Sequence, residues 1–445
     1  MKKIFVVGAG LSSASLIEYL LVNSIVYNWE VIVGDLDVES AINKLSDHPN
    51  GKAVYFDVFS EEMRNSAVSA ADIVISLLPA NLHHLLIESC IRYSKSIITA
   101  SYVPGYLYDL EQEIIDKGMT VLFECGLDPG IDHMSAMQLL DKIRIEEGIP
   151  LSFKSSTGGL VAPEYDDNPW KYKFTWNPRN VILAGKDGAQ YKQNGKLKYV
   201  PYHSLFQRAE PIIINEDSNF ETYANRDSLK YVSTYGLEKI ETMYRGTIRR
   251  SGFSNSWNLL IKLGLTEEGF VLENSETMTY RELTDSMLPE GPTEDLREKV
   301  ALYLGIGRDS QEMRKLEWLG IFEDKEISLQ AATPAGSLQK LLEVKWSLKP
   351  DDKDMIVMQH EIVYKTKHKE IKKITASLIF KGKNKTHTAM SMTVGLPLGI
   401  AAKLILTGKI SKKGIVIPVF KDIYDPILGE LQKFNITFNE REEKI

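Results

Sequence analysis

Short apolar runs alternate with amphipathic stretches through the N-terminal third of the chain. The runs are rich in Val and Ile and do not alternate strictly with polar residues, which is typical of strands buried on both faces of a parallel sheet. The stretches between them have apolar residues at helical spacing. We predict strands at Ile4–Val7, Glu30–Val33, Ala53–Phe56, Ile73–Leu78, Ser96–Ala100 and Met119–Phe123. We predict helices at Leu11–Val22, Val38–Leu45, Leu85–Arg92 and Leu107–Asp116.

This order of strands and helices predicts an α/β fold with a Rossmann-type doubly wound parallel sheet and right-handed crossovers. The pattern changes after residue 150, where Ser152 to Val200 is rich in Gly, Pro, Asn and aromatics and predicts loops and short strands. Ser275 to Leu342 is polar, with Leu and Ile every three or four residues, and predicts helices. Met355–Tyr364 and Ile371–Phe380 predict two adjacent strands joined by a Lys-rich turn. The charged residues Asn439 to Lys444 predict a solvated tail.

Length and charge narrow the class of protein. A chain of 445 residues predicts two or three domains at roughly 150 residues each. The net charge of −7 argues against a general nucleic-acid binder and a basic membrane-surface protein. Two cysteines cannot form a disulfide framework in so long a chain, so we expect a reducing compartment.

Apolar segments give no sign of a leader or a membrane span. The first apolar run is interrupted by Gly8 and Gly10 before it reaches the length of a signal-peptide core. The most apolar later segment, Val394 to Leu406, is short for a membrane span and contains Lys403. We therefore expect a cytoplasmic, enzyme-like protein.

The segment Val7 to Ser13 follows a predicted strand and opens a predicted helix. Gly8 and Gly10 allow a tight turn and a close approach to a pyrophosphate, whose charge then lies at the helix N-terminus. Ser13 stands where the usual third glycine would be, so a βα turn without a ligand remains the alternative. We predict a dinucleotide site at this loop.

The residue that ends the second predicted strand, Asp35, bears on the choice of cofactor. An acidic side chain there accepts hydrogen bonds from ribose hydroxyls and repels a 2′-phosphate. Leu36 and Asp37 follow with no Arg or Lys beside them, which favours NAD over NADP. The alternative is that Asp35 or Asp37 caps the next helix. Asp57, which follows the third strand, either holds the adenine side or is a turn residue.

Three loops with polar residues follow later strands, at 76–81, 99–102 and 124–133. Ligands of open α/β sheets bind at the carboxyl ends of the strands, so these loops are candidates for the chemistry. Asp128 could orient a substrate ammonium or relay a proton, although an Asp before Pro–Gly is also a common turn former. His133 is either functional or a histidine satisfied at the start of a helix.

Several motifs occur in a fixed order along the chain: Leu78-Pro79, Thr-Ala-Ser-Tyr at 99–102, Gly-Leu-Asp-Pro-Gly-Ile-Asp-His at 126–133, Asn-Arg-Asp-Ser at 225–228, Arg-Gly-Thr-Ile-Arg at 245–249, Glu-Trp-Leu-Gly at 317–320 and Met-Gln-His at 358–360. Together they resemble the saccharopine dehydrogenase family of the glutamate-forming type. The octapeptide at 126–133 is the most specific of them, and the likeness runs from residue 3 to about 435.

The resemblance implies interconversion of saccharopine with glutamate and 2-aminoadipate 6-semialdehyde, by hydride transfer to or from a nicotinamide and hydrolysis of an imine. It implies a Rossmann domain at 1–128 that is completed by about 393–430. A mixed α/β substrate and dimerisation domain is then expected at 129–272 and 343–392, and a helical subdomain at 273–342. A homodimer and no metal are expected.

The motifs and the resemblance together supply the candidate site residues. The cofactor is assigned to Gly8, Gly10, Leu11, Ser12, Asp35, Asp57, Val58, Leu78, Pro79, Leu127, Asp128 and Pro129. The substrate is assigned to Ser101, Tyr102, Asp128, Thr157, Trp176, Arg226, Arg245, Thr247 and Arg249. Asp128, which the resemblance places against the secondary amine, is the candidate catalytic residue.

Two departures from the family pattern bear on these expectations. Fungal members that favour NADPH carry an Arg after the second strand, where this chain has Leu36, so we expect NAD as the preferred cofactor, with NADP possible. Relatives often have a Cys at the position of Thr157, which leaves the proton-transfer route open.

Two alternative functions remain. One is a related amine-forming dehydrogenase of the carboxynorspermidine or lysine 6-dehydrogenase type, whose substrates carry fewer carboxylates and do not need both Arg226 and Arg249. The other is a non-catalytic nucleotide-binding regulator, which needs the glycine loop but not Asp128. In each case we expect a small-molecule ligand, and neither nucleic acid nor membrane as a partner.

Overall fold

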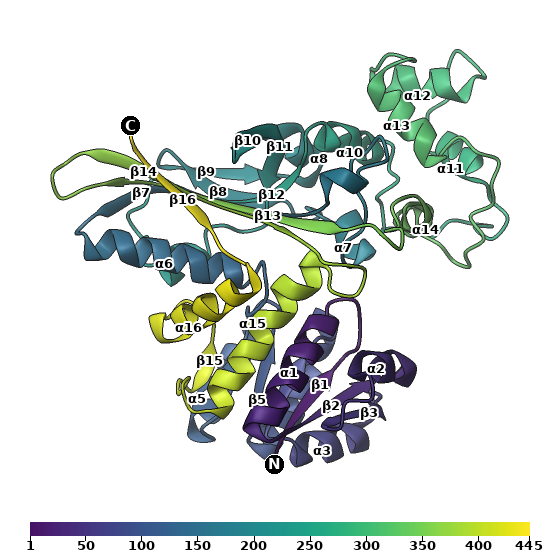
Figure 1. Cartoon of the computed structure of the whole chain (residues 1–445). Helices are drawn as coiled ribbons and strands as arrows, with labels where there is room; N and C mark the ends of the chain where they lie inside the picture. The colour runs from purple at the N-terminus through teal and green to yellow at the C-terminus, as the bar shows by residue number, and fades with distance from the viewer. The chain divides into compact units, whose positions relative to one another are not determined.

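The computed structural model describes residues 1–445, and the chain forms two compact units (Figure 1). The first unit comprises Met1–Pro150 and Tyr364–Ile445, and the second comprises Leu151–Val363. The first unit therefore contains both ends of the chain. The predicted α/β class with a Rossmann-type parallel sheet is confirmed.

The first unit is built on a parallel sheet in the order β15-β6-β5-β4-β1-β2-β3. Because β1 lies between β4 and β2, the strand order reverses there, as in other doubly wound sheets. All six predicted N-terminal strands are present, most of them within a residue or two of the expected ends. The strands are β1 (Lys2–Val7), β2 (Trp29–Asp35), β3 (Gly51–Tyr55), β4 (Ile73–Ser76), β5 (Ser96–Thr99), β6 (Thr120–Leu122) and β15 (Gly414–Val416).

Helices cover this sheet, and one of them comes from late in the chain. In Figure 1, α15 lies alongside α1, and the two helices pack together. α3 packs on α4, and α16 on α6. The helices are α1 (Ala14–Tyr27), α2 (Val38–Leu45), α3 (Glu61–Ala70), α4 (His83–Tyr93), α5 (Glu111–Asp116), α6 (Ile131–Ile145), α15 (Ala389–Leu406) and α16 (Lys421–Leu431), with 3₁₀ turns η1 (Ala80–Leu82), η2 (Gly105–Leu110) and η5 (Gln432–Phe434).

Helix α15 is long and apolar enough to cross a membrane by length and composition, with 18 residues and a mean hydropathy of 1.7. Within the fold, however, 72% of it is buried. A Cβ on Gly395 would lie 2.8 Å from the backbone nitrogen of Leu16, so glycine is what allows α15 to approach α1 this closely. These are the properties of a core helix.

The second unit contains a mixed sheet with the strand order β10-β11-β12-β7-β13 and a side ribbon in which β8 pairs with β12 and β9. β7 and β12 are parallel, whereas β11 runs antiparallel to both β12 and β10. The strands are β7 (Ile149–Val161), β8 (Ala189–Gln193), β9 (Lys196–Val200), β10 (Glu210–Ile214), β11 (Asp217–Ala224), β12 (Thr242–Arg250) and β13 (Asp354–Lys365).

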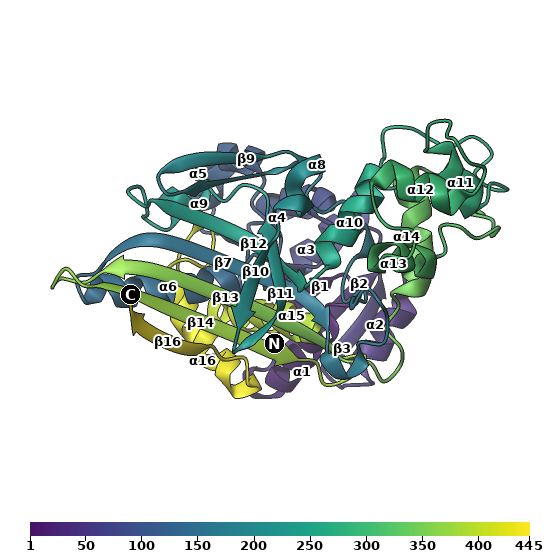
Figure 2. The same cartoon turned by 90° about the horizontal axis from the view of Figure 1, so that it is seen from above.

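An aromatic core fills the second unit, with the rings of Trp170, Tyr172, Phe253, Trp257 and Trp346 in mutual contact. Figure 2 shows α11 to α14 gathered at one end of this unit's sheet. The predicted helices of 275–342 are therefore present. The helices are α7 (Pro178–Ile182), α8 (Tyr202–Leu205), α9 (Tyr231–Thr234), α10 (Phe253–Lys262), α11 (Tyr280–Ser286), α12 (Leu296–Leu304), α13 (Gln311–Leu319) and α14 (Pro334–Lys345), with η3 (Pro163–Tyr165) and η4 (Phe206–Arg208).

The C-terminal residues are almost all exposed, as predicted for a solvated tail, but they form a strand that the sequence did not predict. β16 (Asn439–Lys444) pairs antiparallel with β14 (Ile371–Lys381) in the first unit. The charges of the two strands are complementary: Lys372 binds Glu442 at 2.9 Å and Lys373 binds Glu443 at 2.6 Å. Backbone pairing and cross-strand ion pairs thus hold a segment with almost no apolar residues.

Candidate functional site

The glycine loop has the geometry of a pyrophosphate site. Gly8 has φ +104°, and a Cβ there would lie 3.3 Å from the Leu77 carbonyl oxygen. A Cβ on Gly10 would meet nothing within 4 Å, and Leu11 is 74% exposed, so the loop backbone faces open space. Ser13 Oγ donates to the Gly10 carbonyl at 2.8 Å, directly before α1 begins. The loop therefore presents backbone at the N-terminus of α1, where a dinucleotide phosphate is favoured, and half-buried Ser12 lies in the same turn.

Both carboxylate oxygens of Asp35 accept hydrogen bonds from backbone N–H groups. Its Oδ2 accepts the Ala9 N–H at 2.6 Å, and its Oδ1 accepts the Asp37 N–H at 2.9 Å. Lys44, from the last turn of α2, donates its ammonium to the Ala9 carbonyl oxygen. Burial lowers the pKa of Lys44, and the carboxylates of Asp35 and Asp37 oppose that shift. A cation therefore lies near Asp35, which ends β2, and Asp37, which caps α2.

The two other acidic candidates have local structural roles. Asp37 is the N-cap of α2: its carboxylate accepts hydrogen bonds from Ser40, which hold its pKa below the usual range. Asp57 Oδ1 accepts the Phe59 N–H at 2.9 Å, as in a turn. Val58 is buried, and its carbonyl oxygen accepts a hydrogen bond from Arg64 at 2.6 Å. Asp35 is not the cap.

The other assigned cofactor residues follow β4 and β6. Leu78 is half-buried and Pro79 exposed after β4, and Leu127 and Pro129 are buried after β6. β4 and β6 lie on either side of β5 in the parallel sheet, so the loops that follow them lie at its carboxyl edge.

Ser101, Tyr102 and Asp128 come together at this same edge. The Tyr102 hydroxyl donates to Asp128 Oδ1 at 3.4 Å, and the Ser101 carbonyl accepts the Glu124 N–H at 3.0 Å. All three side chains are half-buried, so they are partly open to a ligand. Asp128 precedes a cis peptide bond to Pro129.

His133 is completely buried, and its Nε2 lies 2.8 Å from Glu124 Oε2. The other oxygen of Glu124 accepts the Val103 N–H at 3.2 Å. This geometry is that of a satisfied histidine at the start of a helix, one of the two interpretations that the sequence left open.

His83 was not among the motifs, yet it links two of the predicted loops. Its Nδ1 lies 2.8 Å from Ser76 Oγ, and its Nε2 lies 2.7 Å from Ser101 Oγ and 3.2 Å from Thr99 Oγ1. Burial lowers the pKa of His83 to about 4, so the imidazole is neutral at pH 7. Its position at the start of the helix after β4 was the only signal in the sequence.

In the second unit, Arg245, Thr247 and Arg249 alternate along β12 and therefore share one face of the strand. Thr247 pairs in register with Thr157 of β7 and Tyr223 of β11, which places these side chains in a row on that face. The structure thus brings four of the predicted substrate residues together on one face of the sheet.

Arg249 has the environment of a buried anion receptor. Its guanidinium lies over the rings of Tyr172, Phe253 and Tyr223, at 5.1, 5.4 and 5.9 Å from their centroids. Its Nη1 donates to the Ile248 carbonyl, whereas its buried Nε has no hydrogen-bond partner. A buried guanidinium with an unsatisfied donor is suited to a carboxylate ligand.

The remaining substrate candidates differ in exposure. Arg245 is buried, and its guanidinium lies 4.5 Å from the Tyr231 ring centroid. Arg226 is exposed, with φ +49°, in the loop after β11. That loop is tied to β12, because the Asn225 N–H donates to the Arg245 carbonyl at 2.8 Å. Trp176 is half-buried against the aromatic core.

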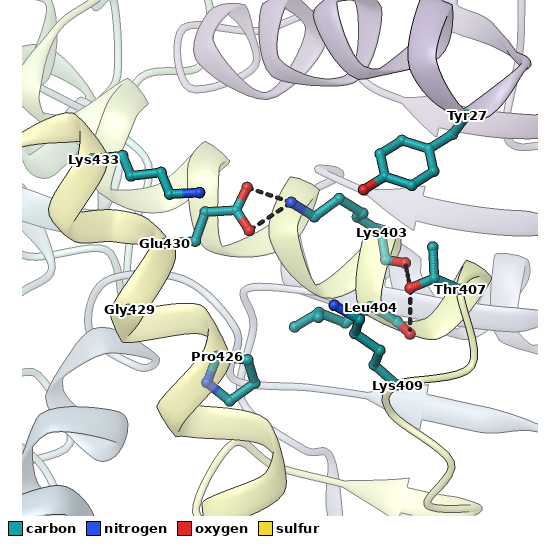
Figure 3. Close-up of a pocket in the computed structure, with 9 residues that line it drawn as sticks. All are labelled: Tyr27, Lys403, Leu404, Thr407, Lys409, Pro426, Gly429, Glu430 and Lys433. Atoms are coloured by element: carbon teal, nitrogen blue, oxygen red, sulfur yellow. Dashed lines mark hydrogen bonds and ion pairs between the residues drawn. The ribbon is translucent and has the colours of Figure 1, made fainter.

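A polar cavity of about 330 Å³ lies elsewhere in the first unit, lined by residues of α1, α15 and α16 (Figure 3). In Figure 3 Lys403 and Glu430 point toward each other, and they form an ion pair. Tyr27 and Thr407 line its other side. Lys2, the first residue of β1, donates to the carbonyls of Asn28 and Leu406, so this cavity adjoins the amino end of β1, opposite the glycine loop.

A doubly wound sheet with a glycine loop at a helix N-terminus defines a dinucleotide-binding protein. The family model "Saccharopine dehydrogenase NADP binding domain" matches residues 4–122, and "Saccharopine dehydrogenase C-terminal domain" matches residues 126–436. The chain belongs to the saccharopine dehydrogenase family.

Curated relatives and a solved structure support this family assignment. The chain is 33% identical to the saccharopine dehydrogenase [NADP(+), L-glutamate-forming] of Saccharomyces cerevisiae, over 99% of both chains. It is 36% identical to the mitochondrial alpha-aminoadipic semialdehyde synthase of Mus musculus, over 98% of this chain and 47% of the mouse protein. The chain thus spans about half the length of that relative. The solved apo structure of the Saccharomyces cerevisiae saccharopine dehydrogenase (L-Glu forming) matches 100% of both chains, with a TM-score of 0.89 and 31% identity.

The comparisons overturn the expectation that NAD is the preferred cofactor. The fungal relatives carry NADP(+) in their names, and the matching N-terminal domain is described as NADP-binding. The expectation of NAD took Asp35 as a free carboxylate and took the absence of an Arg at Leu36 as the absence of any nearby cation. The carboxylate of Asp35 accepts hydrogen bonds from two backbone N–H groups, and the Lys44 ammonium, from the last turn of α2, donates to the carbonyl oxygen of Ala9.

Proposed function

We propose that this protein is an NADP-dependent, L-glutamate-forming saccharopine dehydrogenase of lysine metabolism. The observation that carries the proposal is the match to the yeast enzyme of that name along the whole of both chains, with a TM-score of 0.89. The activity is an oxidation at a CH–NH bond, which interconverts saccharopine with glutamate and 2-aminoadipate 6-semialdehyde.

The glycine loop fits the pyrophosphate of NADP. Gly8 and Gly10 keep the backbone uncrowded, and the N-terminus of α1 supplies N–H groups and a positive dipole end. Lys44 is the cation we assign to the 2′-phosphate, since its ammonium lies at the Ala9 carbonyl beside Asp35. When bound, the nicotinamide supplies the hydride acceptor.

Saccharopine carries three carboxylates, so its site needs several fixed cations. Arg249 supplies a buried guanidinium with an unsatisfied Nε, and we assign it to one carboxylate. We assign Arg226 to a second carboxylate, because it follows β11 in a loop tied to β12. Thr247 and Thr157 add hydroxyl groups on the face that carries Arg249.

Asp128 is the residue we assign to proton transfer. As hydride leaves the carbon beside the secondary amine, the amine proton passes to the Asp128 carboxylate and a C=N bond forms. Water then adds to that carbon and the C–N bond breaks, releasing the amine of glutamate and the semialdehyde. Tyr102, whose hydroxyl donates to Asp128, holds the carboxylate in place.

The first test is absorbance of reduced nicotinamide with purified protein, saccharopine and NADP⁺, with glutamate measured as product. We expect turnover, and we expect Asp128→Asn to lower kcat by roughly 10²- to 10³-fold. Absence of turnover in both directions, by protein that is folded and binds NADPH, would contradict the proposal. Turnover of substrates with fewer carboxylates would then indicate a related amine-forming dehydrogenase.

We further propose that the protein acts as a cytoplasmic homodimer on small molecules, without nucleic acid or membrane as a partner. The family resemblance supports the dimer, and the net charge of −7 supports the absence of nucleic acid. Light scattering on the purified protein should give twice the mass of the 50.3 kDa chain. A mass equal to one chain at micromolar concentration would contradict the dimer.

A further inference from the structure

His83 is a buried imidazole that no motif accounts for. It is 3% exposed, at the first turn of α4, and its ring lies edge-on to Phe123 with centroids 6.5 Å apart. Its Nδ1 contacts Ser76, the last residue of β4, and its Nε2 contacts Ser101 after β5 at 2.7 Å and, at the longer distance of 3.2 Å, Thr99 at the end of β5. The imidazole therefore bridges two adjacent strands at the carboxyl edge of the sheet.

The neutral ring couples the hydrogen bonds on its two sides. A neutral imidazole has one N–H and one lone pair, so it donates to one hydroxyl and accepts from the other. When Nδ1 donates to Ser76, Nε2 accepts the Ser101 O–H. In the opposite tautomer Nε2 donates to Ser101, whose Oγ at 2.7 Å is nearer than Thr99 Oγ1 at 3.2 Å. In either tautomer, His83 uses either the O–H or one lone pair of the Ser101 hydroxyl. The other donor or acceptor positions of that hydroxyl are directed away from His83.

The Ser101 hydroxyl lies at the candidate substrate site. Ser101 is half-buried, whereas Ser76 is completely buried, so only the Ser101 side of the bridge is open to a ligand. The next residue, Tyr102, donates its hydroxyl to Asp128. We propose that His83 is a positioning residue that orients the Ser101 hydroxyl toward the substrate, an inference that rests on the proposed function for the identity of that ligand.

The sharpest kinetic test uses two amides. In His83→Gln the amide reaches the position of Nε2, facing Ser101, whereas in His83→Asn it reaches only that of Nδ1, facing Ser76. We expect His83→Asn to lower kcat/KM for saccharopine about tenfold and His83→Gln to stay within about threefold of wild type. NADPH affinity should not change in either. Both variants replace the imidazole by a buried amide, so they match in polarity and differ in which ring nitrogen the amide replaces.

A double-mutant cycle shows whether His83 acts through Ser101. If it does, Ser101→Ala and the double variant with His83→Asn have the same kcat/KM. Effects of the two substitutions that multiply would overturn the proposal, as would equal losses in His83→Asn and His83→Gln.

A second measurement does not depend on turnover. With ¹⁵N-labelled histidine, the His83 ring of the wild type should show a single neutral tautomer at pH 7, and Ser101→Ala should shift its Nε2 resonance or mix the tautomers. Unchanged His83 signals in Ser101→Ala would overturn the coupling. If the wild type binds NADPH but does not turn over saccharopine, the proposed function fails, and this experiment still decides whether His83 orients Ser101.

Discussion

Asp35 and Lys44 hold opposite sides of one loop residue: Asp35 Oδ2 accepts the Ala9 N–H at 2.6 Å, and the Lys44 ammonium donates to the Ala9 carbonyl oxygen. The two side chains come from the end of β2 and the last turn of α2. They fix the glycine loop from both sides, and they place a cation beside an aspartate that would otherwise repel a phosphate.

Replacing Lys44 should change cofactor selectivity. Lys44→Met removes the only charge that we assign to the 2′-phosphate, so the Kd of NADPH should rise by about tenfold or more, while that of NADH rises much less. Lys44→Arg keeps the charge and serves as the matched control. Fluorescence titration of both reduced cofactors checks this. An equal rise for NADPH and NADH would mean that Lys44 only clamps the loop.

Replacing Arg249 should weaken substrate binding. Arg249→Lys keeps a charge but loses the planar fork and its Nε donor, so kcat/KM for saccharopine should fall roughly 10- to 100-fold, mainly through KM. Arg250→Lys is the matched control. Arg250 is the next residue, also buried, and it contacts the Phe220 ring and Asp217 on the other face of β12. Steady-state kinetics that show the same loss in both variants would argue against a carboxylate at Arg249.

Acid should destabilise the wild type partly through His83. Its pKa is about 4 in the folded protein, against an ordinary value of 6.5, because burial disfavours the charged ring. Between these pH values the unfolded chain binds a proton that the folded chain does not. The free energy of unfolding therefore falls as the pH is lowered through this window, by a total on the order of 3 kcal/mol.

His83→Phe lacks this titration and keeps a ring against Phe123. Its thermal midpoint should therefore depend less steeply on pH between 6.5 and 4 than that of the wild type. Parallel curves for the two proteins, from differential scanning calorimetry at a series of pH values, would show that His83 is accessible to protons in the folded state.

Two glycines inside helices should respond in opposite ways to alanine. A Cβ on Gly395 would lie 2.8 Å from the Leu16 backbone nitrogen, so Gly395→Ala should force α15 from α1 and destabilise the fold by about 1 to 3 kcal/mol. A Cβ on Gly429 of α16 meets nothing within 4 Å, so Gly429→Ala should stabilise by up to about 1 kcal/mol. Urea unfolding of both variants distinguishes a steric effect from helix propensity; a stable Gly395→Ala would contradict the close approach.

Local patterns predicted much of the first unit. The strands β1 to β6 follow from apolar runs of four to six residues, because strands buried on both faces need apolar side chains in succession. The helix Glu61–Ala70 was not predicted, since its ten residues contain few apolar side chains, with only Arg64 and Val68 buried. The strand Asn439–Lys444 was not predicted for a related reason: its exposed residues pair with charges on β14, and a single segment does not reveal its partner.

The candidate site likewise has features that the sequence predicted and contacts that it did not. The sequence by itself determined the glycine loop, the positions of Asp128 and the arginines in their motifs, and the family, because each depends on residues close together along the chain. Only the tertiary structure decided which groups meet: Lys44 with Ala9, His83 with Ser101, and Arg249 with its aromatic rings. Those contacts join residues from different strands and helices. Their energies depend on distance and burial, and neither can be derived from the spacing of residues along the chain.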